Sequence, residues 1–244
     1  FKSSFSNING TNNISIGSES LYSNIDASEN ISIGSQSLYN NDSSYNIAIG
    51  HQTLYNNISP NNTSIGWKSS FNNTIGTNNI IVGKLSSFNN LSGDGIIAIG
   101  NEALYNNDSS YNIAIGHQTL YNSNSLHNTA IGYQSAYTNT NGTENISLGN
   151  YSLYNNDSSN NVSIGYQSLY NNKGSNNTVL GWKSGYSNDL GQFNTIIGSA
   201  SDVNSSTTIN NSTIIGYNSK ANSNNAIILG SNSQVGNDSS NTIL

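Results

Sequence analysis

One feature dominates the sequence: an aliphatic residue followed by glycine returns at intervals of 14 to 18 residues, most often 16 or 17. The glycines of these steps are Gly17, Gly34, Gly50, Gly66, Gly83, Gly100, Gly116, Gly132, Gly149, Gly165, Gly181, Gly198, Gly216 and Gly230. A fixed period of this kind is typical of repeat proteins, in which each repeat is one structural unit stacked on the next. The segment 39–56 also returns unchanged at 105–122, four repeats later. We therefore expect about fourteen stacked coils that arose by duplication.

The residues before each glycine alternate in character, as in Ile47, Ala48 and Ile49. A period of two predicts a β-strand. Because the position directly before the glycine is always Ile, Val or Leu, we expect it to point into the core. The glycine then turns the chain at a place where a Cβ would obstruct.

A second strand is expected after each glycine, around an apolar-aromatic pair such as Leu38 and Tyr39. Asn, Asp, Ser and Gly fill the return, where their side chains can hydrogen-bond to backbone. An Asn also precedes the first strand in most repeats, as at Asn13 and Asn46, and stacked Asn side chains can form ladders. Two short strands and two tight turns account for a coil of about 16 residues. The fold class that follows is all-β, a parallel β-solenoid with flattened, two-sided coils.

Composition limits the alternatives. Only 33% of the residues are hydrophobic and 7% are charged, which is little for a packed globule, yet the regular aliphatic schedule argues against disorder. The chain has no Cys, so its stability must come from stacking. Six Lys and Arg residues against twelve Asp and Glu residues argue against a nucleic-acid partner. No apolar run is long enough to span a bilayer, so we expect no membrane contact within this segment. The start at Phe1, without Met or a signal-like segment, suggests an excised or processed piece.

The middle residue of the first strand is never charged, and it becomes fully aliphatic in later repeats, as at Val179, Ile196 and Ile228. We expect this position to face away from the core and to be covered. The simplest cover is another copy of the chain, because a single stack with so few aliphatic residues is marginal.

The motifs NISIG, NIAIG and NTAIG, and above all the segment 212–244, resemble the head repeats of YadA-like trimeric autotransporter adhesins. The Tyr-rich repeats are similar to those of bacterial and viral tail-fibre proteins. The resemblance covers essentially all coils and implies a left-handed β-roll, a homotrimer and an extracellular place on a cell or virion surface. Most repeats are longer than the usual head repeat, which is a departure from that family.

Two types of repeat divide the chain. In the first eleven, Tyr or Phe stands five residues beyond the glycine, from Tyr22 to Tyr186, whereas the last three have Val203, Ala221 and Val235 there. We therefore expect a Tyr-rich part at 1–189 and a part at 190–244 that is more similar to adhesin heads. The final residues 242–244 match the start of a further repeat.

The slot after the glycine is predicted to be exposed, because it accepts Ser, His, Lys, Tyr and Trp. Its aromatic members Trp67, Tyr133, Tyr166 and Trp182 are candidates for sugar binding, since an aromatic ring can cover the apolar C–H groups of a sugar. Packing over a neighbouring coil or subunit is the simpler alternative.

No residue pattern predicts catalysis, a metal site or a cofactor. The three His residues, His51, His117 and His127, fit solvent-facing positions. The Asp of the repeated NNDSS turn, at Asp42, Asp108 and Asp157, fits a turn better than a calcium site. The acidic residues Glu19, Glu102 and Glu144 lie too far apart in sequence to pair as glycosidase carboxylates. Sequons such as the one at Asn237 are expected by chance in an Asn- and Ser-rich chain and leave glycosylation open.

The sequence therefore predicts a non-enzymatic, extracellular structural protein. We expect a trimeric segment of a surface adhesin or tail fibre that gives reach and rigidity and attaches to a glycan or protein receptor. The alternative is the subunit of an extracellular filament that polymerises end to end through its open coil edges.

Overall fold

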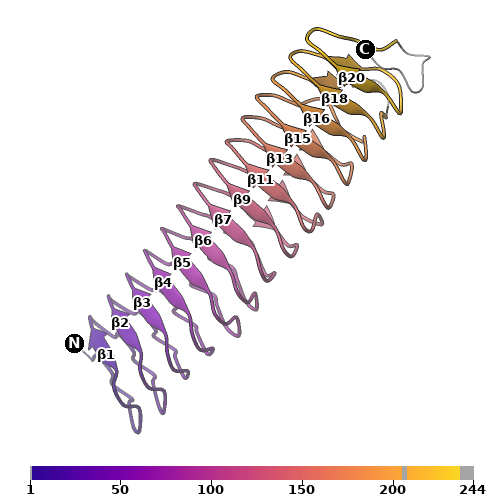
Figure 1. Ribbon diagram of the computed structural model, residues 1–244. Helices are drawn as coiled ribbons and strands as arrows, with labels where there is room; N and C mark the ends of the chain where they lie inside the picture. Colours follow the sequence, from indigo (N-terminus) through magenta and orange to yellow (C-terminus); the bar gives the residue numbers. More distant parts are fainter. Residues whose placement is uncertain (1, 205–207, 237–244) are drawn as a thin grey trace. The chain divides into compact units, whose positions relative to one another are not determined.

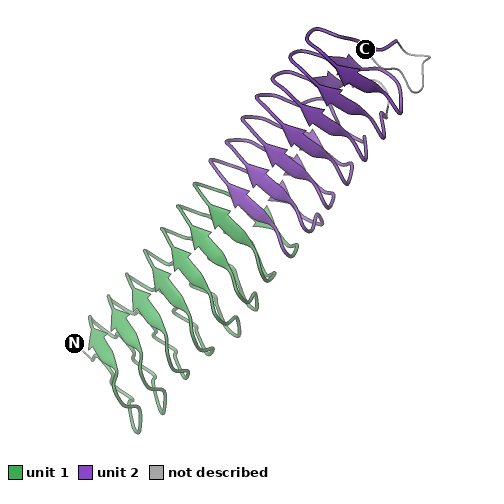
Figure 2. Ribbon diagram, viewed as in Figure 1, with its two compact units in different colours: residues 1–126 green, residues 127–244 purple. Residues whose placement is uncertain are grey.

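The structure is a computed structural model that describes residues 2–204 and 208–236. These residues form two compact units, 1–126 and 127–244 (Figure 2). The chain is an all-β parallel β-solenoid of about 13 turns, and its described residues contain no helix. The sequon at Asn237 and the predicted start of a further repeat at 242–244 lie outside the described residues.

In the first unit, one strand of three residues begins each coil. These first-side strands are β1 (Ile14–Ile16), β2 (Ile31–Ile33), β3 (Ile47–Ile49), β4 (Thr63–Ile65), β5 (Ile80–Val82), β6 (Ile97–Ile99) and β7 (Ile113–Ile115). The second side of the coil has the two-residue strand β8 (Asn122–Ser123). Strands β1 to β7 pair in parallel and in sequence order (Figure 1). The repeat of the sequence is therefore the repeat of the sheet.

The second unit has short strands on both sides of the coil. On the first side lie β9 (Thr129–Ile131), β11 (Ile146–Leu148), β13 (Val162–Ile164), β15 (Thr178–Leu180), β16 (Thr195–Ile197), β18 (Thr213–Ile215) and β20 (Ile227–Leu229). On the second side lie β10 (Thr138–Asn139), β12 (Asn155–Asn156), β14 (Asn171–Asn172), β17 (Asp202–Val203) and β19 (Lys220–Ala221). The first-side strands pair in parallel, and so do β10 with β12, β12 with β14 and β17 with β19.

Each slot of one coil pairs with the same slot of the next, so that Ile14 lies opposite Ile31 and Ser15 opposite Ser32. The turns absorb the unequal repeat lengths. The glycine after the strand is required at this point: Gly17 has a φ of 136°, and a Cβ there would lie 2.5 Å from the carbonyl oxygen of Gly34. The predicted role of the glycine steps is confirmed.

The prediction for the two faces of the first strand is wrong. The middle residue points into the core, where Ser32 and Ala48 are fully buried, whereas the flanking Ile16 and Ile49 are 59% and 36% exposed. The alternation sets which residues share a face but leaves open which face is inside. The interior is narrow and is already filled by the middle side chain and by Leu38 from the second side. The aliphatic residues that flank the middle position therefore form two columns on the outer surface.

Buried Ser side chains in the core are paired with one another. Ser20 Oγ donates to Ser32 Oγ at 2.8 Å, and the hydroxyls of Ser32 and Ser37 are in direct contact. These hydrogen bonds offset the desolvation of hydroxyl groups that would otherwise be costly to bury. The larger middle residue Val179 packs beside Gly185, where a Cβ would lie 3.2 Å from Val179 Cγ1.

Second-side strands of two residues are present in the described coils, but they begin directly after the aromatic residue in β8, β10, β12 and β14, and only β17 and β19 occupy the slot of the predicted pair. The Leu-Tyr pairs themselves lie in consecutive turns. Within these turns Gln36 and Leu38 adopt left-handed φ values of 56° and 46°. A left-handed residue other than glycine costs about 1–2 kcal/mol. Hydrogen bonds to both neighbouring coils hold this backbone, since Gln36 N donates to Ser18 O at 2.9 Å and Leu38 N donates to Thr53 O at 3.0 Å.

The Asn columns confirm the predicted ladders, in two forms. Before the first strand, the side-chain carbonyl accepts from the backbone of the next coil, as when Asn46 N donates to Asn30 Oδ1 at 2.9 Å. In a second column, which faces the first across the return loop, the amides pair directly, and Asn73 Nδ2 donates to Asn57 Oδ1 at 2.7 Å. Both columns are buried, so they satisfy backbone and side-chain groups that water cannot reach.

The sequence boundary predicted near Asp189 separates two repeat types, and it stays a prediction. The two compact units meet elsewhere in the sequence, at 126/127.

Candidate functional site

The slot predicted for sugar binding is exposed. Trp67 is 43% exposed and Trp182 is 51% exposed, and Tyr133 and Tyr166 are also among the exposed side chains. Trp67 lies in the first unit and the other three lie in the second. A role of these rings in binding stays a prediction.

Lysines lie over both Trp rings. Lys68 Nζ is 5.0 Å and Lys84 Nζ is 5.5 Å from the ring centroid of Trp67, and Lys183 Nζ is 4.8 Å from that of Trp182. These are cation–π contacts. They occupy part of the space that a sugar would need to stack on the ring.

Tyr133, Tyr151 and Tyr166 form an edge-to-face cluster in the second unit. The ring centroids of Tyr133 and Tyr151 are 5.2 Å apart, and those of Tyr151 and Tyr166 are 6.0 Å apart. Burial raises the pKa of the Tyr151 hydroxyl, and the hydrogen bond and charge of Tyr133 raise this pKa further. The cluster is thus held by ring packing, and its surroundings favour the neutral form of the Tyr151 hydroxyl.

A ladder of stacked aromatic rings, which sequence reasoning missed, follows the second side of the coils. In the first unit it consists of Phe5, Tyr22, Tyr39, Tyr55, Phe71, Phe88, Tyr105 and Tyr121. In the second unit it consists of Tyr137, Tyr154, Tyr170 and Tyr186, with successive centroids 5.2, 5.0 and 5.3 Å apart. The rings cover one another's faces, so their edges and hydroxyls remain for solvent and partners.

The ladder ends at Tyr186 in the second unit, because the next coil carries Val203 in the same slot. Tyr186 is exposed, whereas Tyr154 and Tyr170 are half-buried. Burial raises the pKa of Tyr170, and the neighbouring hydroxyls of Tyr154 and Tyr186 raise this pKa further.

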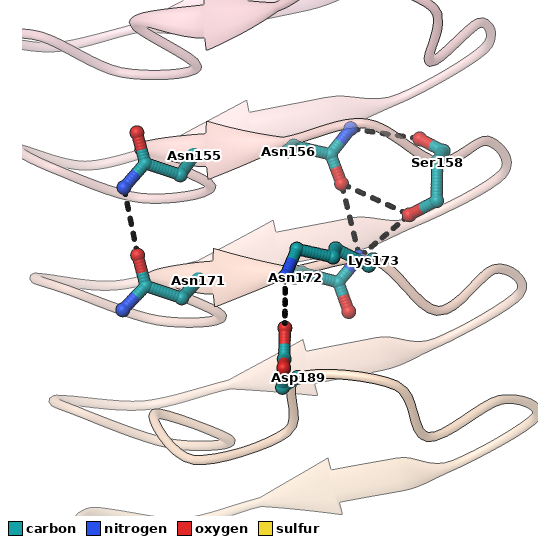
Figure 3. A network of polar contacts seen from close by, with 7 residues as sticks. All are labelled: Asn155, Asn156, Ser158, Asn171, Asn172, Lys173 and Asp189. Carbon is teal, nitrogen blue, oxygen red and sulfur yellow. Dashed lines mark hydrogen bonds and ion pairs between the residues drawn. The ribbon is translucent and has the colours of Figure 1, made fainter.

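A column of exposed or half-buried polar side chains runs beside the ladder, one residue after each ring. In the first unit Asn72 Nδ2 donates to Asn89 Oδ1 at 3.0 Å, and Asn89 Nδ2 donates to Asn106 Oδ1 at 2.8 Å. In the second unit Asn155 Nδ2 donates to Asn171 Oδ1 at 2.8 Å (Figure 3). An amide can make four hydrogen bonds, so each exposed member keeps capacity for a ligand.

In the second unit this column forms the floor of a groove of about 620 Å³, lined by Asn155, Asn171, Lys173, Tyr186, Ser187 and Asp189. A smaller hollow of about 180 Å³ shares Asn155 and Lys173 with it and adds Thr138, Thr140, Asn156 and Asp157. The combined groove crosses four coils. Each coil contributes two lining residues, two positions apart in the sequence. We call the first set the floor and the second set the wall: the floor is Thr138, Asn155, Asn171 and Ser187, and the wall is Thr140, Asp157, Lys173 and Asp189.

The wall carries the charges of the groove. Lys173 Nζ lies 3.3 Å from Asp189 Oδ1, and both side chains are more than half exposed. The carboxylate of Asp157 accepts from Thr140 Oγ1 at 2.7 Å and from the Asn141 backbone at 3.1 Å. Two carboxylates and one ammonium give the wall a net negative charge.

Buried amides lie next to the exposed Asn155 and Asn171 in the same strands (Figure 3). Asn156 Nδ2 donates to Asn139 Oδ1 at 2.8 Å, and Asn172 Nδ2 donates to Asn156 Oδ1 at 2.9 Å. Asn156 neighbours Asn155 in β12, and Asn172 neighbours Asn171 in β14, so each buried residue fixes an exposed one. Asn172 Oδ1 is buried and has no donor among the described residues.

The residues considered for metal binding do not converge. Within residues 2–204 and 208–236, no group of three or more His, Asp or Glu side chains could hold a metal ion. Asp108 Oδ1 accepts from the backbone of Leu91 at 3.0 Å and of Ser92 at 2.6 Å, so this Asp caps a turn of the preceding coil. The same described ranges contain no helix that could cross a membrane.

The ladder and the groove could have been found from the sequence, because aromatic and polar residues recur at adjacent slots of successive repeats. Tyr154 with Asn155 and Tyr170 with Asn171 show it most plainly. No family model, no curated protein and no solved structure matches the chain.

Proposed function

We propose that the chain is a structural segment of an extracellular adhesin or fibre, and that three copies associate through the outer aliphatic columns. The observation that carries the proposal is the outer face of the first-side strands. Its two columns contain only Ile, Val, Leu and Thr in both units, with no charged residue. Exposed apolar patches of this extent are typical of interaction sites.

Another copy of the chain is the occupant that fits this face best. The columns have no charge to match against a charged partner, and they repeat in register from coil to coil. A second copy offers the same spacing and the same side chains, which is the complementarity that a symmetric assembly uses. The resemblance to trimeric adhesin heads favours three copies and a place outside the cell.

The test is the mass of the protein in solution, measured by sedimentation equilibrium. We expect the wild type to be a trimer. The double variant Ile80→Lys and Ile99→Lys should be a folded monomer, because two charges per copy would enter the interface. Tyr111→Lys is the matched control, since Tyr111 is 56% exposed and lies outside the columns.

A wild-type chain that stays a folded monomer would refute the proposed association. Indefinite fibres that persist in the double variant would favour end-to-end polymerisation through the coil edges instead.

A further inference from the structure

The groove of the second unit is periodic, and its period restricts what can fill it. Thr138, Asn155, Asn171 and Ser187 offer one polar side chain per coil along its floor. The adjacent rings are 5.0 to 5.3 Å apart. A ligand that uses every coil must therefore repeat a hydrogen-bonding group at about this spacing.

Two common linear polymers do not meet this requirement. An extended peptide along the groove would advance about 3.3 Å per residue, so it would fall out of step with the coils. A nucleic acid would bring phosphates to a wall on which Asp157 and Asp189 outnumber Lys173. The partner should be uncharged and should rise by one coil per unit.

An extended β-1,4-linked glycan has both properties. Its hexose units follow one another in a nearly straight chain at close to the ring spacing of the ladder. Each unit presents hydroxyl or amide groups at its rim and C–H groups on its faces. Amide and hydroxyl side chains on the floor suit the rim. The Tyr186 ring stacks on Tyr170 and has Lys183 Nζ 6.0 Å from its centroid, so its exposed edge is the part that suits the C–H groups.

We propose that the groove crossing 138–189 binds an uncharged β-1,4-linked glycan of glucose or N-acetylglucosamine units, with one sugar per coil over four coils. The larger part of the groove, lined by residues of three coils, has a volume of about 620 Å³, which lies within the range of ligand sites, and the hollow that extends it to the fourth coil has a volume of about 180 Å³. The site lies on the second side of the coil, whereas the aliphatic columns belong to the first-side strands, so the glycan site does not depend on the proposed association.

The experiment is calorimetric titration of the full chain with chitohexaose, cellohexaose and, as a control, maltohexaose, whose α-1,4 linkages make a curved chain. We expect binding of one or both β-linked hexasaccharides and none of maltohexaose. Within the bound series, affinity should rise from the disaccharide to the tetrasaccharide and then level off, because the groove spans four coils. The two β-linked probes distinguish glucose from N-acetylglucosamine recognition.

Two substitutions locate the site. Asn171→Ala and Asn155→Ala should each weaken binding about tenfold, the size of the loss of one good hydrogen bond. Asn89→Ala is the matched control, because Asn89 occupies the same slot in the first unit and is also part of a hydrogen-bonded amide column. It should leave the affinity unchanged.

Absence of binding to both β-linked probes would overturn the proposal, as would equal binding of maltohexaose or affinity that does not increase with length. An equal loss in Asn89→Ala would also overturn it, since binding would then belong to the whole polar column. The sedimentation mass of each variant is measured alongside. If Asn171→Ala changes the assembly state of the chain together with its glycan binding, the floor of the groove contacts another copy of the chain, and the glycan site is refuted.

Discussion

The neighbouring residues Asn155 and Asn156 of β12 provide a matched test of the buried amide ladder. Asn156 Nδ2 donates to Asn139 Oδ1 at 2.8 Å and to Ser158 O at 2.7 Å. Asn156 Oδ1 accepts from Asn172 Nδ2 at 2.9 Å and from Ser158 Oγ at 3.1 Å. Asn156→Ala removes four buried hydrogen bonds, whereas Asn155→Ala removes one exposed bond, to Asn171.

The expected loss follows from this count. A net contribution of about 1 kcal/mol per hydrogen bond gives about 4 kcal/mol for Asn156→Ala. The loss is reduced to about 2–4 kcal/mol because Ser158 Oγ and Asn172 Nδ2 both keep a bond to the carbonyl of Gly174. Asn155→Ala should change the free energy of unfolding by less than about 0.5 kcal/mol.

Urea denaturation followed by Trp fluorescence measures both values. In a Trp67→Phe background, Trp182 is the remaining Trp and reports on the unit that contains the substitution. Stability in repeat proteins is mainly a sum of local and nearest-neighbour contributions, so a probe in the same unit is needed. Equal shifts for the two variants, or a shift below about 1 kcal/mol for Asn156→Ala, would refute the assignment of stability to the buried ladder.

Three further predictions concern the core and the titrating groups. Leu104→Ala should lower the free energy of unfolding by about 2–5 kcal/mol in urea denaturation, because Leu104 is fully buried in a narrow core. Burial raises the pKa of Asp202 above the ordinary Asp value of 3.8. The protonated carboxyl is therefore compatible with the fold under acidic conditions, and stability is lost as the pH rises through the raised pKa. Asp202→Asn should raise the thermal midpoint at pH 7, but not below about pH 3.8. Burial and neighbouring charges raise the pKa values of Tyr39 and Tyr170 above 10.0, so the stability that these neutral hydroxyls provide is lost as the pH rises through the raised values. The thermal midpoint should therefore decrease once the pH exceeds about 10, and it should decrease less steeply in the double variant Tyr39→Phe and Tyr170→Phe.

The repeat period, the parallel stacking, the turn glycines and the Asn ladders could be predicted from the sequence because each depends on one slot repeated in register. The inward face could not, since the alternation of Ile47, Ala48 and Ile49 is the same whichever face is inside. The inward face is determined by the narrow interior of the coil, in which Ala48 and Leu54 lie in the same buried cluster.

The position of the strand on the second side of the coil was mispredicted for a different reason. The aromatic residue of the Leu-Tyr pair favours a strand, yet Leu38 takes a left-handed φ, which is sterically unfavourable for a residue other than glycine. Hydrogen bonds to the coils on both sides override the local preference there. The groove likewise depends on residues some 16 positions apart, such as Asn155 and Asn171, which only the stacking brings together.

The central claim is that the middle slot of each first-side strand faces the core and the slot before the glycine faces outward. The chain has no Cys, so single thiols at neighbouring slots can test it directly. Ser64 is 1% exposed and Ile65 is 37% exposed. In the monomeric fraction, we predict that a small thiol reagent modifies the Ile65→Cys variant rapidly and leaves the folded Ser64→Cys variant protected until it is unfolded. Rapid modification of Ser64→Cys with protection of Ile65→Cys would contradict the account.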